Sequence, residues 1–158
     1  MITLVFDSEN VLVQVRDGFP PQDEWQVIQE AGGHVEDRND WKTFDHANVA
    51  AIRAEQFMGK PYIAVDRGDH VHPRFDVIAA PQVGDDVSQS FNGDSYPCGK
   101  IVSISPSMGR IETSDGTVFT RRKPGRGSSV DRSALWIVKG SSCFSMIPGH
   151  HDRRNPHF

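Results

Sequence analysis

The sequence has little cysteine and no long apolar run. Only Cys98 and Cys143 occur among the 158 residues, so a disulfide framework is excluded and we expect reduced thiols inside a cell. No window reaches the roughly 18 consecutive apolar residues of a transmembrane helix, and the first residues lack the basic and apolar regions of a secretory signal. We therefore expect a cytoplasmic protein that does not bind membranes.

The motifs that identify common enzyme classes are also missing. The chain has no phosphate-binding loop, no GxSxG elbow, no HExxH helix and no paired-cysteine motif. Neither cysteine has a nearby histidine in the arrangement that activates a nucleophile. We therefore predict a protein that is not an enzyme and that needs no cofactor.

Two histidines, His70 and His72, share one face if their segment is extended, and Asp66 and Asp69 are close in the sequence. Two imidazoles and a carboxylate are typical ligands of a divalent metal. No third ligand follows at a diagnostic spacing, and Pro73 favours a loop. The sequence therefore predicts no metal site, although this pair is the best candidate for one.

The charge is distributed unevenly along the chain. Residues 1–98 hold 7 Lys and Arg against 17 Asp and Glu, a formal charge of −10, whereas residues 99–158 hold 10 against 4, a charge of +6. Such asymmetry indicates either a charged partner or attraction between the two halves within one fold.

The first 82 residues have the pattern of an acidic lobe with helices and strands. Alternating apolar residues predict a β-hairpin from segments 2–6 and 11–15, with turn residues between them. Apolar residues at helical spacing predict two short helices at 22–31 and 46–57, the second with Asp45 as its N-cap and an apolar stripe of Val49, Ile52 and Phe57.

Residues 83–158 have the pattern of an all-β domain. The pair Asp115-Gly116 between two alternating segments predicts a two-residue type I′ hairpin. Short strands at this spacing predict a closed or nearly closed antiparallel barrel of five or six strands. The predicted fold is therefore α+β: an N-terminal hairpin and two helices, followed by a small barrel. The candidate strands are 86–91, 100–105, 110–114, 117–121, 135–138 and 143–147.

Three segments of the second half resemble strands of a known barrel type. They are Val83-Gly84-Asp85-Asp86-Val87, Gly99-Lys100-Ile101-Val102-Ser103-Ile104 and Arg110-Ile111-Glu112-Thr113. A GD-x-V strand followed by a G-x-V/I-x-x-I strand resembles SH3-like barrels of the KOW and Tudor type. The resemblance covers about 65 residues and implies an SH3-like fold, which hosts many different functions.

A second resemblance covers roughly residues 60–158. The runs DRGDHVHPRFDVIAAPQVGD, SFNGDSYPCGKIVSIS and GHHDRRNPHF resemble uncharacterised accessory proteins of tailed bacteriophages. This resemblance implies a phage origin and, as the setting, the cytoplasm of an infected bacterium. It assigns no catalytic residue.

Basic residues are concentrated in the second half, many of them in the Gly- and Ser-rich segment 123–133 and in the C-terminal tail. Arginines on loops contact a phosphate backbone without selecting a sequence, and we predict binding of RNA or single-stranded DNA. The alternative is a solvated loop, or one that docks on the acidic lobe. Phe119, Trp136 and Phe144 are candidates for base stacking, although Phe119 and Phe144 also fit the barrel core. The predicted nucleic-acid-binding residues are Lys100, Arg121, Arg122, Lys123, Arg126, Arg132, Arg153 and Arg154.

The acidic lobe offers a second hypothesis. In segment 34–41, the carboxylates of Glu36, Asp37 and Asp40 surround Trp41, an arrangement that docks on a basic host protein with the indole as anchor. The protein is then an inhibitor of host transcription, replication or defence machinery. The same acids alternatively pair with the basic loop of the chain itself, and a minor virion component is a further alternative.

Overall fold

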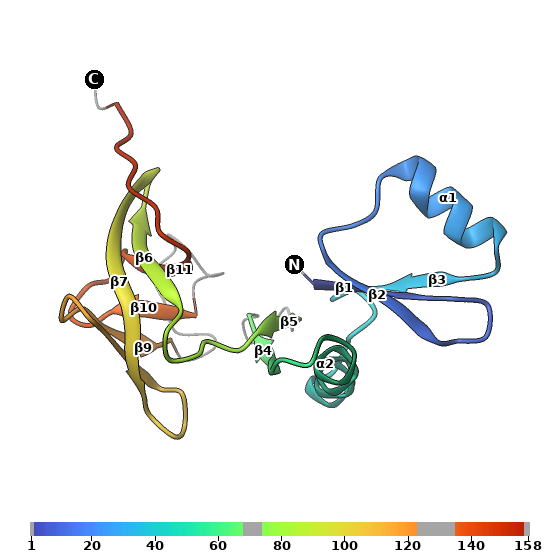
Figure 1. Ribbon diagram of the computed structural model, residues 1–158, viewed down its shortest axis with the longest axis horizontal. Coiled ribbons are helices and arrows are strands. Elements are labelled where there is room, and N and C mark those ends of the chain that lie inside the picture. The colour runs from blue at the N-terminus through green and yellow to red at the C-terminus, as the bar shows by residue number, and fades with distance from the viewer. Residues whose placement is uncertain (1, 68–73, 123–134, 157–158) are drawn as a thin grey trace. The chain divides into compact units, whose positions relative to one another are not determined.

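The computed structural model describes residues 2–67, 74–122 and 135–156 (Figure 1). The chain divides into two units, residues 1–80 and 81–158, so the division follows Ala80, whereas the sequence analysis placed it after Gln82. With the chain divided after Ala80, unit 1 holds 7 Lys and Arg against 14 Asp and Glu. Unit 2 holds 10 Lys and Arg against 7 Asp and Glu. The formal charges are therefore −7 and +3.

Unit 1 begins with a three-stranded antiparallel sheet. Strand β1 (Ile2–Phe6) lies between β2 (Leu12–Asp17) and β3 (His34–Glu36). The sequence analysis predicted only the pairing of the first two segments, and the third strand was not expected. A strand of three residues, His34-Val35-Glu36, is too short for alternation to be detected. It pairs with β1, and the His34 ring stacks on Phe6 with the ring centroids 4.8 Å apart.

The two predicted helices are present, as α1 (Gln22–Glu30) and α2 (Phe44–Met58). The N-cap of helix α2 lies two residues before the predicted one: it is Thr43 and not Asp45, and the Thr43 side chain accepts the backbone N–H of His46 at 3.2 Å. Gly59 ends the helix in the left-handed conformation, which glycine adopts without a Cβ clash.

The buried face of α2 is made of alanines. The predicted stripe is wrong, because Val49 and Ile52 are each 48% exposed and Phe57 is 46% exposed. Small side chains let the helix backbone approach the two-stranded antiparallel sheet of β4 (Tyr62–Asp66) and β5 (Phe75–Ala79), so packing distance decides which face is buried. The buried residues of α2 are Ala47, Ala50, Ala51 and Ala54.

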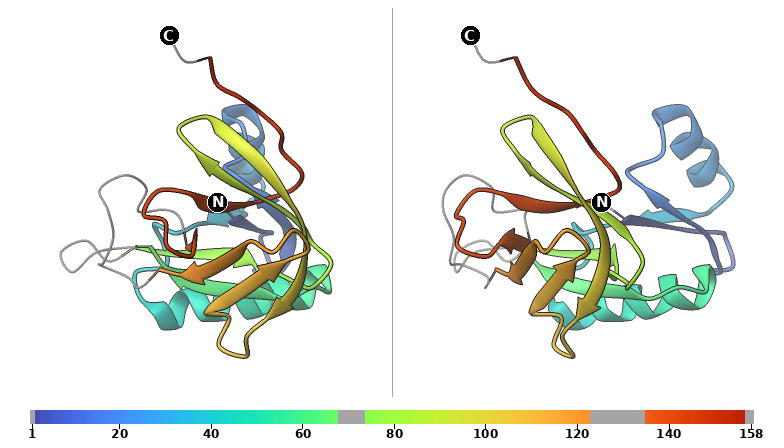
Figure 2. Two further views of the ribbon diagram at one scale, coloured as in Figure 1. Left: turned by 90° about the vertical axis from the view of Figure 1, so that its left-hand side faces the viewer. Right: turned by 60° about the vertical axis from the view of Figure 1, so that its left-hand side comes forward.

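Unit 2 is a closed antiparallel barrel of six strands, which confirms the predicted architecture (Figure 2). Its interior holds Ile101, Ile111 and Phe119, together with Cys98, which is fully buried in β7. Burial raises the pKa of the Cys98 thiol. Around the barrel the strands are β10 (Trp136–Val138), β11 (Ser145–Pro148), β6 (Asp86–Phe91), β7 (Asp94–Ile104), β8 (Arg110–Thr113) and β9 (Val118–Arg121).

The type I′ hairpin lies in a different place from the predicted one. Asn92 and Gly93 have φ of 51° and 86° and join β6 to β7, which is the two-residue type I′ pattern. Between β8 and β9 only Gly116 has positive φ, at 88°, so the type I′ prediction for Asp115-Gly116 is wrong. Burial alone raises the pKa of Asp115, but hydrogen bonds from Thr117 and Thr113 outweigh it and lower that pKa.

Candidate nucleic-acid interface

The structure places the predicted basic residues in several separate positions of unit 2. Lys100 lies in β7, Arg121 ends β9, and the Arg122 backbone N–H donates to the Leu135 carbonyl. Arg153 and Arg154 lie in the C-terminal segment, which we define as residues 149–156. Three of the predicted basic residues lie outside the described part of the chain: Lys123, Arg126 and Arg132. The candidate metal ligands His70 and His72 also lie outside it.

Two of these cations already have partners in the barrel. The Lys100 ammonium lies 3.1 Å from Asp86 Oδ1 across the β6–β7 pair. The Arg121 guanidinium lies over the Trp136 ring, 5.5 Å from its centroid. Trp136 and Phe119 are buried, and the Trp136 indole donates to the Met108 carbonyl, so neither ring offers a face to a base.

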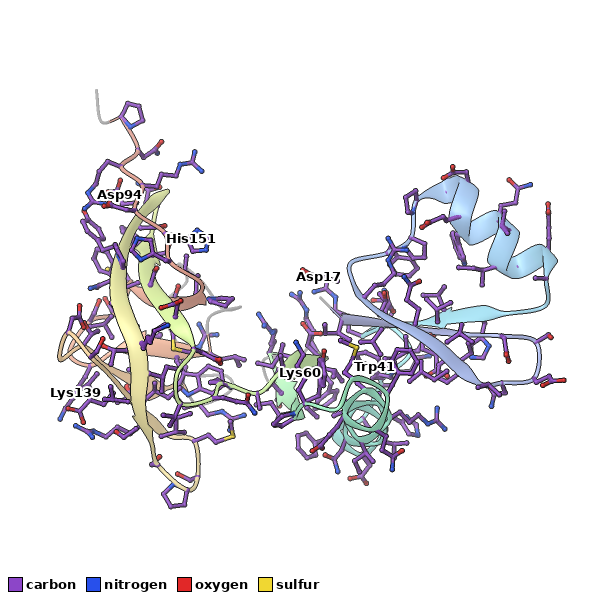
Figure 3. The ribbon with its side chains drawn as sticks, viewed as in Figure 1. Asp17, Trp41, Lys60, Asp94, Lys139 and His151 are labelled. Carbon is purple, nitrogen blue, oxygen red and sulfur yellow. The ribbon has the colours of Figure 1, made fainter. Side chains whose placement is uncertain are left out.

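The C-terminal segment runs along the β6–β7 hairpin (Figure 3). Ser95 and Arg153 exchange two backbone hydrogen bonds of 2.8 and 3.0 Å, which extend the β pairing of β7 by one bridge. The Asn155 N–H donates to Asp94 Oδ1 at 2.7 Å, and the His151 N–H donates to Ser88 Oγ at 2.9 Å. These contacts fix the segment's arginines against one end of the hairpin.

Three half-buried aromatic rings gather at the same end of the hairpin, and we name them the aromatic shelf: Phe91, Tyr96 and Phe144. The Phe144 ring lies 5.7 Å from Phe91 and 6.1 Å from Tyr96, centroid to centroid. The Arg154 guanidinium lies 3.8 Å from the centroid of Tyr96. Cationic and aromatic side chains are therefore in contact at this site.

Sequence reasoning found Arg153, Arg154 and Phe144 but missed the other two rings of the shelf. The Asn92-Gly93 dipeptide was the sequence signal that could have located these two rings. A two-residue turn at this dipeptide pairs Phe91 with Asp94, and it therefore places Phe91 and Tyr96 on one face of the hairpin as diagonal neighbours. The same register could have been derived from the dipeptide alone.

Arg153 and Arg154 bring two positive charges to this end of the hairpin, and Asp94 and Asp152 bring two negative ones. Arg153, His150 and His151 have exposed side chains, and Arg154 is paired with Asp152 at 2.8 Å. Asp94 uses one carboxylate oxygen to accept the Asn155 N–H. Among the described cations of this segment, the exposed Arg153 side chain is therefore the one whose charge no ion pair offsets.

The acidic segment in unit 1 differs from its prediction. Trp41 is 3% exposed and Asp37 is 2% exposed, so the expectation of an exposed tryptophan anchor is wrong. Asp37 accepts the Asn39 N–H at 2.8 Å, and Asp40 accepts the Asp37 N–H at the same distance. These carboxylates shape a turn that directs the indole into the core. Of the predicted docking set, Glu36 and Asp40 keep accessible side chains, and their role in docking stays a prediction.

Within residues 2–67, 74–122 and 135–156, no group of three or more His, Cys, Asp or Glu side chains is placed to hold a metal ion. None of the helices in these ranges is long and apolar enough to cross a membrane. Comparisons with protein-family models, with curated proteins and with solved structures each find no match.

Proposed function

We propose that the C-terminal segment and the aromatic shelf of unit 2 bind single-stranded nucleic acid, RNA or DNA, largely through backbone phosphates. The observation that carries this proposal is the contact of Arg154, on the C-terminal segment, with Tyr96, one of three half-buried rings that lie together: Phe91 and Tyr96 on the β6–β7 hairpin and Phe144 just before β11. Proteins that bind single strands without sequence preference combine these two elements: cations that follow the backbone and rings on which bases stack.

The charge of each unit supports the same assignment. Unit 2 carries +3 and unit 1 carries −7, so a polyanion is attracted to the barrel unit and repelled by the other. Within unit 2, the cations Lys100 and Arg121 are engaged by Asp86 and Trp136, whereas the Arg153 side chain is exposed. Arg153 is therefore the residue we assign to phosphate.

The setting that we propose is that of a non-enzymatic accessory protein of a tailed bacteriophage, in the host cytoplasm. Its support is the resemblance of three sequence runs between residues 60 and 158 to such proteins. We also propose that the barrel is SH3-like: Val83-Gly84-Asp85-Asp86-Val87 leads into β6, and the G-x-V/I-x-x-I pattern lies on β7, which pairs with β6.

Binding should depend steeply on salt. We expect a fluorescent oligothymidylate to bind the chain at 50 mM salt, as measured by anisotropy, and to dissociate as salt rises. Arg153→Gln should weaken binding about threefold to tenfold at that salt and reduce the log–log salt slope by about 0.7, because one phosphate contact is lost.

Lys139→Gln is the matched control, since it removes one exposed positive charge from the far end of the barrel unit (Figure 3). The Lys139 backbone N–H donates to Val118 on β9, well away from Asp94. We expect Lys139→Gln to change neither affinity nor slope. Equal effects of the two substitutions would assign binding to overall charge, and no binding at low salt would favour a protein partner instead.

A further inference from the structure

We propose that the face of Tyr96 covered by Arg154 is a nucleobase-stacking subsite, and that the chain's own arginine occupies it in competition with a base. This inference rests on the proposed function, because it names the position at which the bound strand would place a base. It also assigns the two adjacent arginines opposite roles: Arg153 contacts phosphate, and Arg154 covers the ring.

The Arg154 side chain lies directly over the Tyr96 ring. Its guanidinium carbon is 3.8 Å from the ring centroid, well inside the range of about 6 Å for a cation–π contact. A base cannot use that ring face while the guanidinium is there. Arg154 is nevertheless 52% exposed, so it can leave the ring for solvent without opening the core.

Other groups hold Arg154 on the ring. Its Nη1 donates to the Ser95 carbonyl at 2.7 Å, to Asp152 Oδ1 at 2.8 Å and to the Arg153 carbonyl at 3.2 Å. A guanidinium with these partners has less of its charge and fewer donors available for a phosphate. This is the arrangement of a covering group rather than of a phosphate ligand.

The position of the Tyr96 ring does not depend on the Arg154 side chain. The Ser95–Arg153 bridge and the bond from the Asn155 N–H to Asp94 hold the segment by backbone groups that do not involve the Arg154 side chain. Phe144 packs against Tyr96 with its ring plane inclined by 60°, and it keeps the tyrosine ring in place from another side. Substituting Arg154 therefore uncovers a ring that stays positioned.

The occupant that fits this face is an unstacked base of a flexible single strand. Every base has a π-face, so stacking on one tyrosine is tolerant of sequence. A duplex keeps its bases stacked inside the helix and does not present them to a ring without unpairing. The subsite therefore favours single strands over duplexes of the same charge.

The test compares two probes on the full chain: an oligothymidylate, and an abasic oligomer with the same number of phosphates. Only the first can stack, so the ratio of the two affinities measures stacking separately from charge. We expect Arg154→Ala to weaken binding of the abasic probe, because one positive charge is lost, and to raise the affinity ratio about fivefold or more. Arg153→Ala is the matched control, and it should weaken both probes equally and leave the ratio unchanged.

A second substitution identifies the ring. Tyr96→Leu keeps an apolar side chain at the half-buried position but removes the π-face, so adding it to Arg154→Ala should return the affinity ratio to the unaltered value or below. The inference is overturned if Arg154→Ala weakens both probes by the same factor, or if the raised ratio persists without Tyr96. If the unaltered chain bound neither probe at low salt, the proposed function itself would fail.

Discussion

Replacing Phe119 by alanine should destabilise the barrel by about 3–5 kcal/mol, since truncating a buried aromatic loses its transfer free energy and leaves a cavity. Phe119 has 0% exposure and is the largest fully buried side chain in the part of the chain that the structure describes. It lies on β9, opposite Ile111 on β8 and Val138 on β10, so its ring fills the space shared by three strands. No neighbouring strand can move into that space without disturbing the closed barrel.

The loss of barrel stability in Phe119→Ala is measured by hydrogen exchange with mass spectrometry, in peptides from β6 to β11 of the full chain. Val102→Ala is the control, because Val102 lies in β7 with 51% of its surface exposed and its truncation leaves no cavity. We expect protection to fall throughout the barrel in the Phe119 variant and to change little in the control. Equal effects of the two substitutions would contradict the position of Phe119 at the centre of the core.

Replacing Trp41 by alanine should destabilise unit 1 by about 3–5 kcal/mol for the same physical reason. The indole packs in one cluster with Leu4, Phe6 and the alanine face of α2. Its Nε1 is buried and has no hydrogen-bond partner within the described residues. An unpaired buried donor destabilises the folded state, and Trp41→Phe removes that donor while it loses some side-chain volume. Trp41→Phe should therefore lower the free energy of unfolding much less than Trp41→Ala.

Urea unfolding followed by far-UV circular dichroism distinguishes these cases. The expected order of stability is the unaltered chain and Trp41→Phe close together, with Trp41→Ala clearly lower. A partner anchor would behave differently: Trp41→Ala would leave the unfolding midpoint unchanged while abolishing capture of a basic host protein. That result would contradict the core position and restore the docking hypothesis for segment 34–41.

The barrel was predictable because its signals are local. Alternating strands and Gly-containing turns occur in order along 86–147, and short turns pair β6 with β7, β7 with β8, β8 with β9 and β10 with β11. Two pairings that close the barrel, β9 with β10 and β11 with β6, join segments farther apart in the sequence and have no such local signal. The turn type was less predictable. Asp115 accepts from Thr113 Oγ1 and from the Thr117 N–H, and these bonds accompany a backbone with positive φ at Gly116 alone.

The face of α2 shows a limit of hydrophobic patterning. Val49 and Ile52 are more hydrophobic than Ala47 and Ala50, yet the alanines are the buried residues. Hydrophobicity ranks side chains by transfer free energy, but a helix that lies close against a sheet selects them by size. The sequence alone does not state how closely the helix and the sheet approach.

The candidate site was half predictable. The arginines of the C-terminal segment are evident from composition, but their contact with Tyr96 depends on pairing between distant parts of the chain. Arg154 and the Ser95 carbonyl that it contacts are 59 residues apart, and no local pattern encodes such a pair. The sequence therefore indicated which cations to consider, and the structure identified the ring beside one of them.

The most direct test of nucleic-acid binding is an amide chemical-shift titration of the ¹⁵N-labelled full chain with a short oligothymidylate at low salt. The account predicts shifts at Phe91 and residues 94–96 of the hairpin, at Phe144, and at residues 150–155 of the C-terminal segment. Amides in unit 1 and in the β8–β9 hairpin should not move. An unchanged spectrum at saturating oligomer, or shifts confined to unit 1, would contradict it.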